Sequence, residues 1–197
     1  MPKVGLQPIR RRQLISATIE AIHAYGYDET TMARIAARAG LSPGIITHYF
    51  GGKDELLEAT MRSLLTDFQR LVVKGLQERT EPMDRISAIV SASFDETQCT
   101  PQVVAAWLAF WAQVPHHPGL ARLQRTYRLR LHSNLRRELG RLGLPPESRE
   151  ELAELTGGLI DGIWMRSALS GTGLDTVRAR RTVLGSLRLH LAALGVG

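Results

Sequence analysis

The sequence contains one cysteine, Cys99, and therefore cannot form a disulfide bond within a single chain. Because no disulfide requires an oxidising compartment, we expect a cytoplasmic protein. The longest apolar run, residues 103–114, is interrupted by Gln113 and is shorter than the ~20 residues of a membrane-spanning helix. The charged N-terminal segment contains Pro2 and Pro8 but no apolar stretch, which argues against a secretory signal. The sequence therefore predicts no membrane partner.

Aromatic residues are also scarce, since Trp, Tyr and Phe together make up 6% of the chain. Charged residues at 22% and hydrophobic residues at 44% are ordinary proportions for a globular protein. This composition excludes a disordered tail and a small fold held together by disulfides. Strand-like alternation is hard to find, whereas apolar residues recur at helical spacing along the whole chain. We therefore predict an all-α protein.

Glycine and proline divide the chain into about nine expected helices. The third covers about residues 43–49, with Ser42 as its N-cap and Pro43 at its first helical position. The fourth opens at Lys53 and continues beyond residue 65. The expected breaks, from the N-terminus, are Gly26, Gly40, residues 51–52, Pro82, Pro101, and residues 115–119, 143–146 and 171–173. Segments of this length and amphipathic character are typical of a helical bundle.

Positive charge is concentrated at the N-terminus. The net charge is +6, and residues 1–53 hold seven basic and three acidic side chains, or +4 of that total. Residues 54–197 hold 18 basic and 16 acidic side chains, or +2. A basic module on a nearly neutral body fits a polyanion such as nucleic acid. We predict an N-terminal domain of residues 1–52 and a second domain of residues 53–197.

Residues 31–50 have the spacing of a helix-turn-helix. Ala36 supplies the small side chain that lets the second helix cross the first closely. Gly40 lies four residues later, where the turn requires a positive φ that glycine adopts freely. Ile46 follows after six more residues, where an apolar side chain holds the second helix against the first. With Ile35 and other apolar residues on the same side, one face forms a core and the other remains free to enter a DNA groove.

The free face supplies polar groups suited to DNA. The expected contacts are Thr31, Ser42, Gly44, Ile45, Thr47, His48, Tyr49 and Lys53. The N-terminus of the short second helix can approach phosphates or base edges, and the Tyr49 hydroxyl and Lys53 ammonium suit phosphate contacts. The run of Arg10, Arg11 and Arg12 can neutralise further phosphates.

Other interpretations remain open. Short helix pairs with a glycine turn occur in many all-α proteins, where His48 and Tyr49 would be ordinary surface residues. A small helical enzyme is the main alternative from another class, but no nucleophile elbow, phosphate loop or paired metal ligands are found. The segment Gly171-Thr172-Gly173 follows no strand, so it is not a dinucleotide-binding loop. A helical adaptor that uses the arginine-rich stretch 122–141 is a third alternative. We expect no catalytic residue, no metal site and no cofactor.

The helix-turn-helix that ends in His48-Tyr49-Phe50 and is followed by Lys53 resembles the TetR family of transcriptional repressors. Further segments resemble the family's repressors of choline-to-glycine-betaine genes, which respond to osmotic stress: MPKVGLQPIRRRQLISAT, HYFGGKDELLEATMR, FDETQ, AWLAFWA and LIDGIWMRSALSG. The resemblance implies a homodimer, a double-stranded DNA operator, a C-terminal ligand and dimerisation body, and choline or betaine aldehyde as effector. It also implies DNA contacts at Ser42, Gly44, Thr47, His48, Tyr49 and Lys53. Pro43 departs from the Thr or Lys often found there, so a contact from this position is in doubt.

Choline is a quaternary ammonium ion, which aromatic faces and a carboxylate bind best. Trp107 and Trp111 are spaced i, i+4 on one expected helix, so both rings can face one cavity. The expected ligand-binding residues are Trp107, Phe110, Trp111, Trp164, Asp161, Glu96, Phe94 and Tyr127, with the three tryptophans as the cage and Asp161 or Glu96 as the counter-charge. An aromatic stripe of this kind is equally typical of a helix core, and Asp161 has Arg166 as an alternative partner. Another small cationic or apolar effector is also compatible with these residues.

The C-terminal helices are the expected dimer interface by resemblance. Gly158 and Gly162 are four residues apart and would let a second helix approach closely, although glycine pairs also allow packing within one chain. Two DNA-binding modules about one helical turn apart would read a palindromic site. The arginines between residues 122 and 141 are expected to form a solvated face balanced by the glutamates of residues 147–154.

Overall fold

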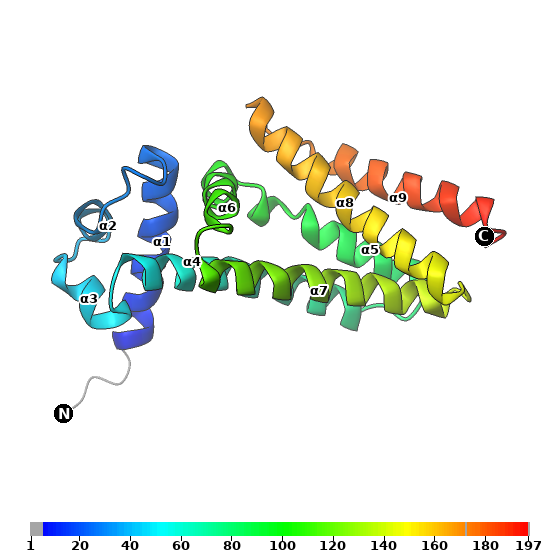
Figure 1. Cartoon of the computed structure of the whole chain (residues 1–197), viewed down its shortest axis with the longest axis horizontal. Coiled ribbons are helices and arrows are strands. Elements are labelled where there is room, and N and C mark those ends of the chain that lie inside the picture. Colours follow the sequence, from blue (N-terminus) through cyan, green and yellow to red (C-terminus); the bar gives the residue numbers. More distant parts are fainter. Residues whose placement is uncertain (1–5, 172, 197) are drawn as a thin grey trace. The chain divides into compact units, whose positions relative to one another are not determined.

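The computed structural model describes residues 6–171 and 173–196, so the observations on Pro2 and Thr172 concern residues outside this range. Within it the chain forms nine α-helices, one short 3-10 helix and no strand (Figure 1). The prediction of an all-α protein with about nine helices is confirmed. The helices are α1 (Leu6–Tyr25), α2 (Met32–Arg38), α3 (Gly44–Phe50), α4 (Lys53–Gln77), α5 (Pro82–Ser93), η1 (Glu96–Gln98), α6 (Pro101–Gln113), α7 (Pro118–Arg141), α8 (Pro146–Ser170) and α9 (Thr176–Ala193).

The helices form two compact units. Unit 1 consists of the described residues up to Thr66 together with Thr100–Leu123, and unit 2 consists of Asp67–Cys99 together with the described residues from Gln124 onward. Unit 1 therefore holds α1–α3, the beginnings of α4 and α7, and α6, which packs against α1. The expected boundary at residue 52 falls inside unit 1, and the division into functional domains at that point stays a prediction.

The core of unit 1 joins α1, α2, α3 and the beginning of α4. Its buried side chains are Leu14, Ala17, Ala21, Ile35, Ala36, Ile46 and Leu56. Ala36 and Ile46 have no exposed surface, as their roles in a helix-turn-helix require. Leu41 and Phe50 are partly buried against the same cluster. Burying one apolar face of each short helix provides the stability that seven residues of helix lack in isolation.

The turn between α2 and α3 follows from its residue types. The Thr31 hydroxyl caps α2 by accepting a hydrogen bond from the Arg34 amide. At the other end, Gly40 has φ +65° and the Leu41 amide donates to the Ala36 carbonyl at 2.9 Å, which closes the helix in the usual glycine-terminated manner. The positive φ predicted for Gly40 is confirmed.

The beginning of α3 differs from the prediction. The helix starts at Gly44, Pro43 occupies the N-cap position, and no side chain caps it, so the cap expected from Ser42 is wrong. The Ile45 and Ile46 amides instead donate to the backbone carbonyls of Ser42 and Pro43, each at 3.1 Å. Because these bonds span three residues, the first turn is tight. The Ser42 side chain caps no amide and is exposed.

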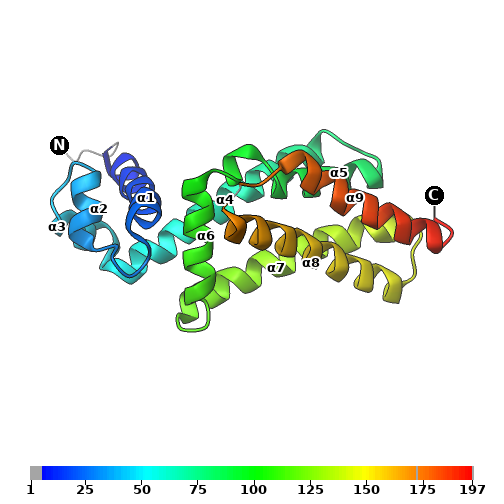
Figure 2. The same cartoon turned by 90° about the horizontal axis from the view of Figure 1, so that it is seen from above.

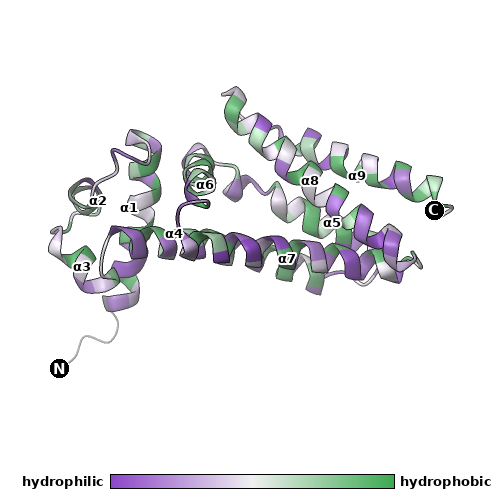
Figure 3. Ribbon diagram, in the orientation of Figure 1, coloured by the Kyte–Doolittle hydropathy of each residue, from purple (hydrophilic) through white to green (hydrophobic). Residues whose placement is uncertain are grey.

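In unit 2, α9 packs against both α5 and α8, and Figure 2 shows α8 and α9 running side by side. Fully buried apolar residues of this unit include Ile86, Ile89, Leu135 and Val183, which come from α5, α7 and α9. Hydrophilic residues lie along most of α7 in Figure 3. All seven arginines of this helix are exposed, as predicted, and they are Arg122, Arg125, Arg128, Arg130, Arg136, Arg137 and Arg141.

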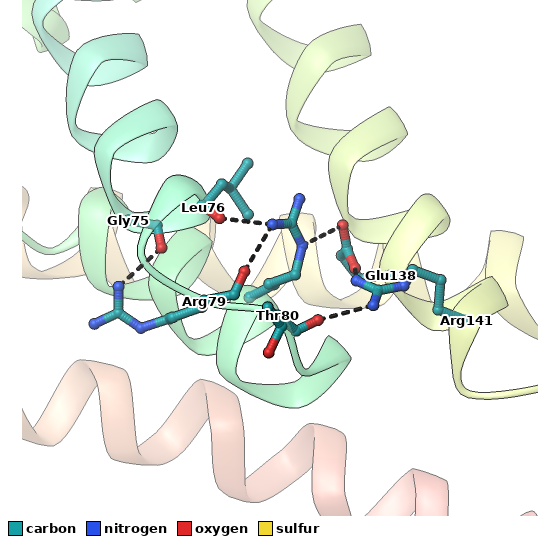
Figure 4. Close-up of polar contacts among 7 residues, drawn as sticks. Gly75, Leu76, Arg79, Thr80, Glu138 and Arg141 are labelled. Carbon is teal, nitrogen blue, oxygen red and sulfur yellow. Dashed lines mark hydrogen bonds and ion pairs between the residues drawn. The ribbon is translucent and has the colours of Figure 1, made fainter.

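A buried glutamate fixes the turn between α4 and α5 to α7 (Figure 4). Glu138 accepts a hydrogen bond from Arg85 at 2.8 Å and one from Arg141 at 2.6 Å, although its side chain is only 2% exposed. Arg85 also donates to the carbonyls of Leu76 and Arg79, and Arg141 donates to that of Thr80. No local pattern in the sequence indicates this cluster, because its members are far apart in the chain.

Candidate DNA-binding surface and effector-binding residues

The expected DNA contacts lie on or beside α3, which belongs with α1 and α2 at one end of the chain (Figure 1). The exposed members are Thr31, Ser42, Gly44, Thr47 and His48, whereas Ile45, Tyr49 and Lys53 are half-buried. Ile45 and Tyr49 pack against the core cluster of unit 1. Between them Ile46 points into that core, so α3 presents its polar side outward.

Two of the half-buried residues are held by neighbouring rings. The His48 and Tyr49 rings meet edge to face, with centroids 5.0 Å apart. The Lys53 ammonium lies 5.2 Å from the Tyr27 ring centroid, a cation–π distance. Burial and the carboxylates of Asp54 and Asp28 raise the pKa of Tyr27, so its ring stays neutral. Lys53 therefore starts α4 from a defined position beside α3.

The three consecutive arginines of α1 have three different environments. Arg10 donates to the Gln13 side chain at 3.0 Å, and Arg12 is exposed. Arg11 donates to the Tyr49 carbonyl, and its guanidinium carbon lies 4.2 Å from the Phe50 ring centroid. Adjacent side chains on a helix face different directions. The sequence offered no signal to distinguish these three arginines, because the direction that faces α3 depends on how the two helices pack.

Much of the remaining N-terminal positive charge is paired locally. Arg34 forms an ion pair with Glu29 at 3.0 Å, and Arg38 forms one with Glu20 at 3.5 Å. Both guanidinium groups also lie over the Tyr25 ring, at 4.7 Å and 5.5 Å. The partners Glu29 and Glu20 are two of the three acidic residues already counted in the net charge of +4, so the excess comes from the other basic residues of this segment.

The aromatic candidates for the effector site divide between the units. Trp107, Phe110 and Trp111 lie on α6 in unit 1. The two indole rings approach each other with centroids 5.8 Å apart and an interplanar angle of 45°, which agrees with the prediction that they share one side of the helix. Phe110 is fully buried and Trp107 nearly so, whereas Trp111 is half-buried. Burial of this kind is compatible with a core role as well as with a ligand wall.

The other candidates lie in unit 2, and Asp161 is the most distinctive of them. Burial raises the pKa of its carboxyl to about 6, and the neighbouring Glu154 adds to the shift. Among the described residues no cation forms an ion pair with Asp161, and Arg166, its expected partner within the chain, is exposed. Burial also raises the pKa of Tyr127, and the Asp161 charge raises it further. Asp161 and Tyr127 are therefore electrostatic neighbours.

The remaining candidates surround this pair unequally. Tyr127 meets Phe68 edge to face at 5.4 Å. Trp164 is buried, and its indole interacts with the Cys99 sulfur. Burial raises the pKa of the Cys99 thiol to about 11, and the contact with Trp164 offsets only part of this rise. Phe94 has no exposed surface and lies in the core, whereas Glu96 is exposed. Of the two candidate counter-charges, only Asp161 has an apolar environment.

The arginine-rich helix α7 is paired in part with α8. Arg136 bonds Glu150 at 3.1 Å, and His132 lies 3.4 Å from the same carboxylate. A pocket of about 510 Å³ is lined by Arg136 and Glu150 together with Pro146, Glu147, Arg149 and Glu151. No cluster of His, Cys, Asp or Glu suited to a metal ion occurs in the part of the chain that the structure describes. In the same part, every helix is too short or too polar to cross a membrane.

Comparison with protein families gives two matches. Residues 14–60 match the bacterial regulatory proteins of the tetR family, and residues 82–192 match the C-terminal region of BetI-type transcriptional repressors. The first match covers the helix-turn-helix, and the second covers α5 to nearly the end of α9.

Individual relatives extend these matches over nearly the full length. The chain is 46% identical over 194 residues to the HTH-type transcriptional regulator BetI of Burkholderia lata, covering 98% of this chain and 100% of that protein. It is 47% identical over 193 residues to the BetI regulator of Klebsiella pneumoniae, covering 97% and 98%. A transcriptional regulator of Pseudomonas aeruginosa PAO1 has the same fold with a TM-score of 0.80 at 27% identity, over 94% of this chain and 91% of that one. A regulator of Saccharomonospora viridis, solved with choline, gives a TM-score of 0.74 at 19% identity, over 88% and 92%.

Proposed function

This chain belongs to the tetR family of bacterial regulatory proteins and to its BetI-type repressors, and we therefore propose that it represses the genes that convert choline to glycine betaine. As a member of this family it is a transcriptional repressor that binds operator DNA, and it is not an enzyme. We place it in the cytoplasm with its operator, and we propose choline, or betaine aldehyde, as the effector that modulates operator binding under osmotic stress.

The observation that carries the effector proposal is the half-buried carboxyl of Asp161, which has no ion-pair partner among the described residues. An ionised carboxylate in apolar surroundings is costly unless a cation compensates it. Choline supplies such a cation without requiring hydrogen-bond acceptors for its ammonium group. Tyr127 beside this carboxylate, and Trp164 one helical turn further along α8, provide the aromatic surface that a quaternary ammonium prefers.

The relatives add support of two kinds. Several regulators named BetI share about 46% of their residues with this chain over nearly their full length. The Saccharomonospora regulator was crystallised with choline and shares the fold of this chain, so the fold is compatible with choline binding.

A homodimer completes the proposal, with α8 and α9 as the interface. Large apolar side chains are exposed on these helices, namely Leu155, Met165, Leu169, Val177 and Leu189. A Cβ added to Gly158 or Gly162 would meet no atom within 4 Å, so packing within the chain does not explain these two glycines. They lie with Met165 and Leu169 on one face of α8, where a partner helix can approach closely.

The function is tested by a gel shift on the DNA upstream of the chain's own gene, with and without choline. We expect a specific complex whose stability or mobility changes with choline but not with glycerol, an uncharged control of similar size. Specific binding that responds to tetramethylammonium but to neither choline nor betaine aldehyde would assign another cationic effector. Binding that is competed equally well by bulk DNA would contradict the operator assignment.

The effector site is tested by replacing the two candidate counter-charges separately. Asp161→Asn should abolish the choline response and leave operator affinity nearly unchanged, whereas Glu96→Gln should retain the response because Glu96 is exposed. In the wild type the choline affinity should rise as the pH increases through about 6, where Asp161 ionises. A response that survives in Asp161→Asn would remove this residue from the site.

The tryptophans on α6 require their own test. Trp111→Ala should abolish the choline response. Trp107→Phe is the milder companion variant, because it keeps an aromatic ring at a buried position. If Trp111→Ala reduces operator affinity and the choline response equally, the α6 stripe is core rather than ligand wall. Thermal melts of both variants separate loss of the site from loss of the fold.

A further inference from the structure

Arg11 is the only one of the three consecutive arginines that reaches α3. Its guanidinium donates a hydrogen bond to the Tyr49 carbonyl and lies 4.2 Å from the Phe50 ring centroid. Both partners belong to the last turn of α3. The side chain therefore links α1 directly to the C-terminal end of the helix that carries the expected DNA contacts.

The physics of a short helix gives this link its importance. With seven residues α3 has about two turns, and the carbonyls of its last turn lack partners within the helix. A cation at this end satisfies a carbonyl and interacts favourably with the negative end of the helix dipole. The planar guanidinium can stack on Phe50 while it donates, which the ammonium of a lysine does less well.

The bond also restricts rotation of α3 about its own axis. Ile46, near the middle of the helix, is fully buried in the core of unit 1 and provides one fixed point. The Tyr49 carbonyl and the Phe50 ring provide a second one at the end of the helix. With two fixed points, the direction in which Thr47 and His48 project is determined.

We propose that Arg11 is a positioning residue, which sets the orientation of α3 for operator binding and does not itself bind a phosphate. The inference rests on operator binding, which follows from membership of the family, and not on the identity of the effector. It separates Arg11 from Arg12, which is exposed and remains a candidate phosphate contact.

The salt dependence of DNA binding distinguishes the two roles. Each phosphate contact that is lost makes the slope of log K against log salt shallower by about 0.9. We expect Arg11→Ala to weaken binding about 10-fold at every salt concentration without changing this slope, because the loss is one of orientation. Arg12→Ala is the matched control, and its slope should become shallower by about one contact.

The measurement is fluorescence anisotropy with a labelled duplex of the DNA upstream of the chain's own gene, titrated at several potassium chloride concentrations. Arg11→Lys serves where Arg11→Ala does not fold, since lysine keeps the charge but loses the stacking plane. It should also weaken binding with an unchanged slope. A slope reduced by about one in Arg11→Ala, or wild-type binding by Arg11→Lys, would overturn the proposal.

A second measurement needs no DNA. Amide hydrogen exchange of residues 46–52 in the free protein should become faster in Arg11→Ala and Arg11→Lys, and should stay unchanged in Arg12→Ala. Equal exchange in all variants would show that Arg11 does not hold α3 and would contradict the proposal. If the wild-type protein bound no specific DNA, the proposed function would fail while this measurement would still decide the role of Arg11.

Discussion

At the scale of single residues, Arg11 and Arg12 are neighbours on α1, yet Arg11 contacts the end of α3 and Arg12 is exposed. The spacing of Ala36, Gly40 and Ile46 predicted a crossing, a turn and an anchor, and these three residues have the burial and backbone conformation expected of them. Such roles depend on local chain geometry. The direction of one arginine depends on the phase of its helix relative to a second helix, which no local pattern encodes.

Asp161 allows a prediction about stability. Its pKa in the folded chain is raised from 3.8 to about 6, so between these values the folded state binds more protons than the unfolded state. Stability is therefore lost as the pH rises through this window. Asp161→Asn removes this cost, and we expect it to stabilise the ligand-free protein by about 3 kcal/mol at pH 8, since one pKa unit corresponds to about 1.4 kcal/mol.

Urea unfolding at pH 4 and pH 8 measures this effect. The variant should match the wild type at pH 4 and exceed it at pH 8, with Glu96→Gln as an exposed control that changes little at either pH. Destabilisation by Asp161→Asn at pH 8 would mean that the carboxylate has a favourable partner in the folded chain. The expected gain in stability and loss of choline response would make Asp161 a residue kept for function at a cost to folding.

At the scale of helices and turns, Gly40 controls the angle between α2 and α3. A Cβ added there would meet no atom within 4 Å, so the cost of a side chain is the cost of φ +65° alone. We expect Gly40→Ala to destabilise the protein by about 1 kcal/mol, the usual penalty for an L residue in this region. Operator affinity should fall with it, because the angle of α3 changes.

Gly157→Ala is a suitable control for this measurement. It lies inside α8, where a Cβ also meets nothing and φ is not positive, so the substitution should stabilise by up to about 1 kcal/mol. In thermal melts, Gly40→Ala should therefore lower the melting temperature and Gly157→Ala should raise it, although both replace glycine by alanine. Equal effects would show that the backbone of Gly40 relaxes without cost.

The charged cluster around Glu138 stabilises the C-terminal end of α4, because Arg85 binds both Glu138 and the carbonyls of Leu76 and Arg79. Burial raises the pKa of Glu138, but hydrogen bonds from Arg85 and Arg141 outweigh it and the net pKa lies below its ordinary value. The stability it contributes is present above the unfolded-state pKa and is lost as the pH falls through the lowered pKa. We expect Glu138→Gln to destabilise by about 3 kcal/mol at pH 7, because it leaves two arginines without their anion.

The exposed Glu150→Gln is the control for this cluster, since it weakens only the surface contacts with Arg136 and His132 and should cost less than about 1 kcal/mol. Urea unfolding at pH 7 and pH 3.5 gives both values. The Glu138→Gln deficit should shrink at the lower pH as the wild-type carboxylate protonates. A deficit independent of pH would indicate a packing defect rather than a lost charge.

At the scale of the whole molecule, the proposed dimer can be disrupted without disturbing the single chain. Gly162→Leu places a side chain where the chain has open space, and Leu169→Glu puts a charge on a residue that is 71% exposed. Both should yield monomers in analytical ultracentrifugation with near-normal helical content. Leu129→Glu changes a leucine that is 58% exposed on α7, outside the proposed interface, and should remain dimeric. Monomers from Leu129→Glu, or dimers from both α8 variants, would move the interface elsewhere.

The all-α class and the number of helices were predictable because periodicity, glycine and proline act over short distances. The division into two units was not, since it depends on α6 returning to pack on α1 and joining the helix-turn-helix in unit 1. Contacts between residues about a hundred positions apart leave no periodic signal. For the same reason, the sequence could predict Trp107 and Asp161 as ligand-binding residues without showing that they belong to different units.

The cluster of Figure 4 has a further consequence for how this chain can vary. The carbonyls of Arg79 and Thr80, two neighbours in one turn, are held by arginines from two different helices, α5 and α7. An insertion between α4 and α5 would shift one of these carbonyls by up to ~3.8 Å, the spacing of consecutive Cα atoms, and break the arrangement. A substitution at either position would leave both carbonyls in place. Among descendants of this sequence, the turn should therefore change freely in composition while its length stays constant.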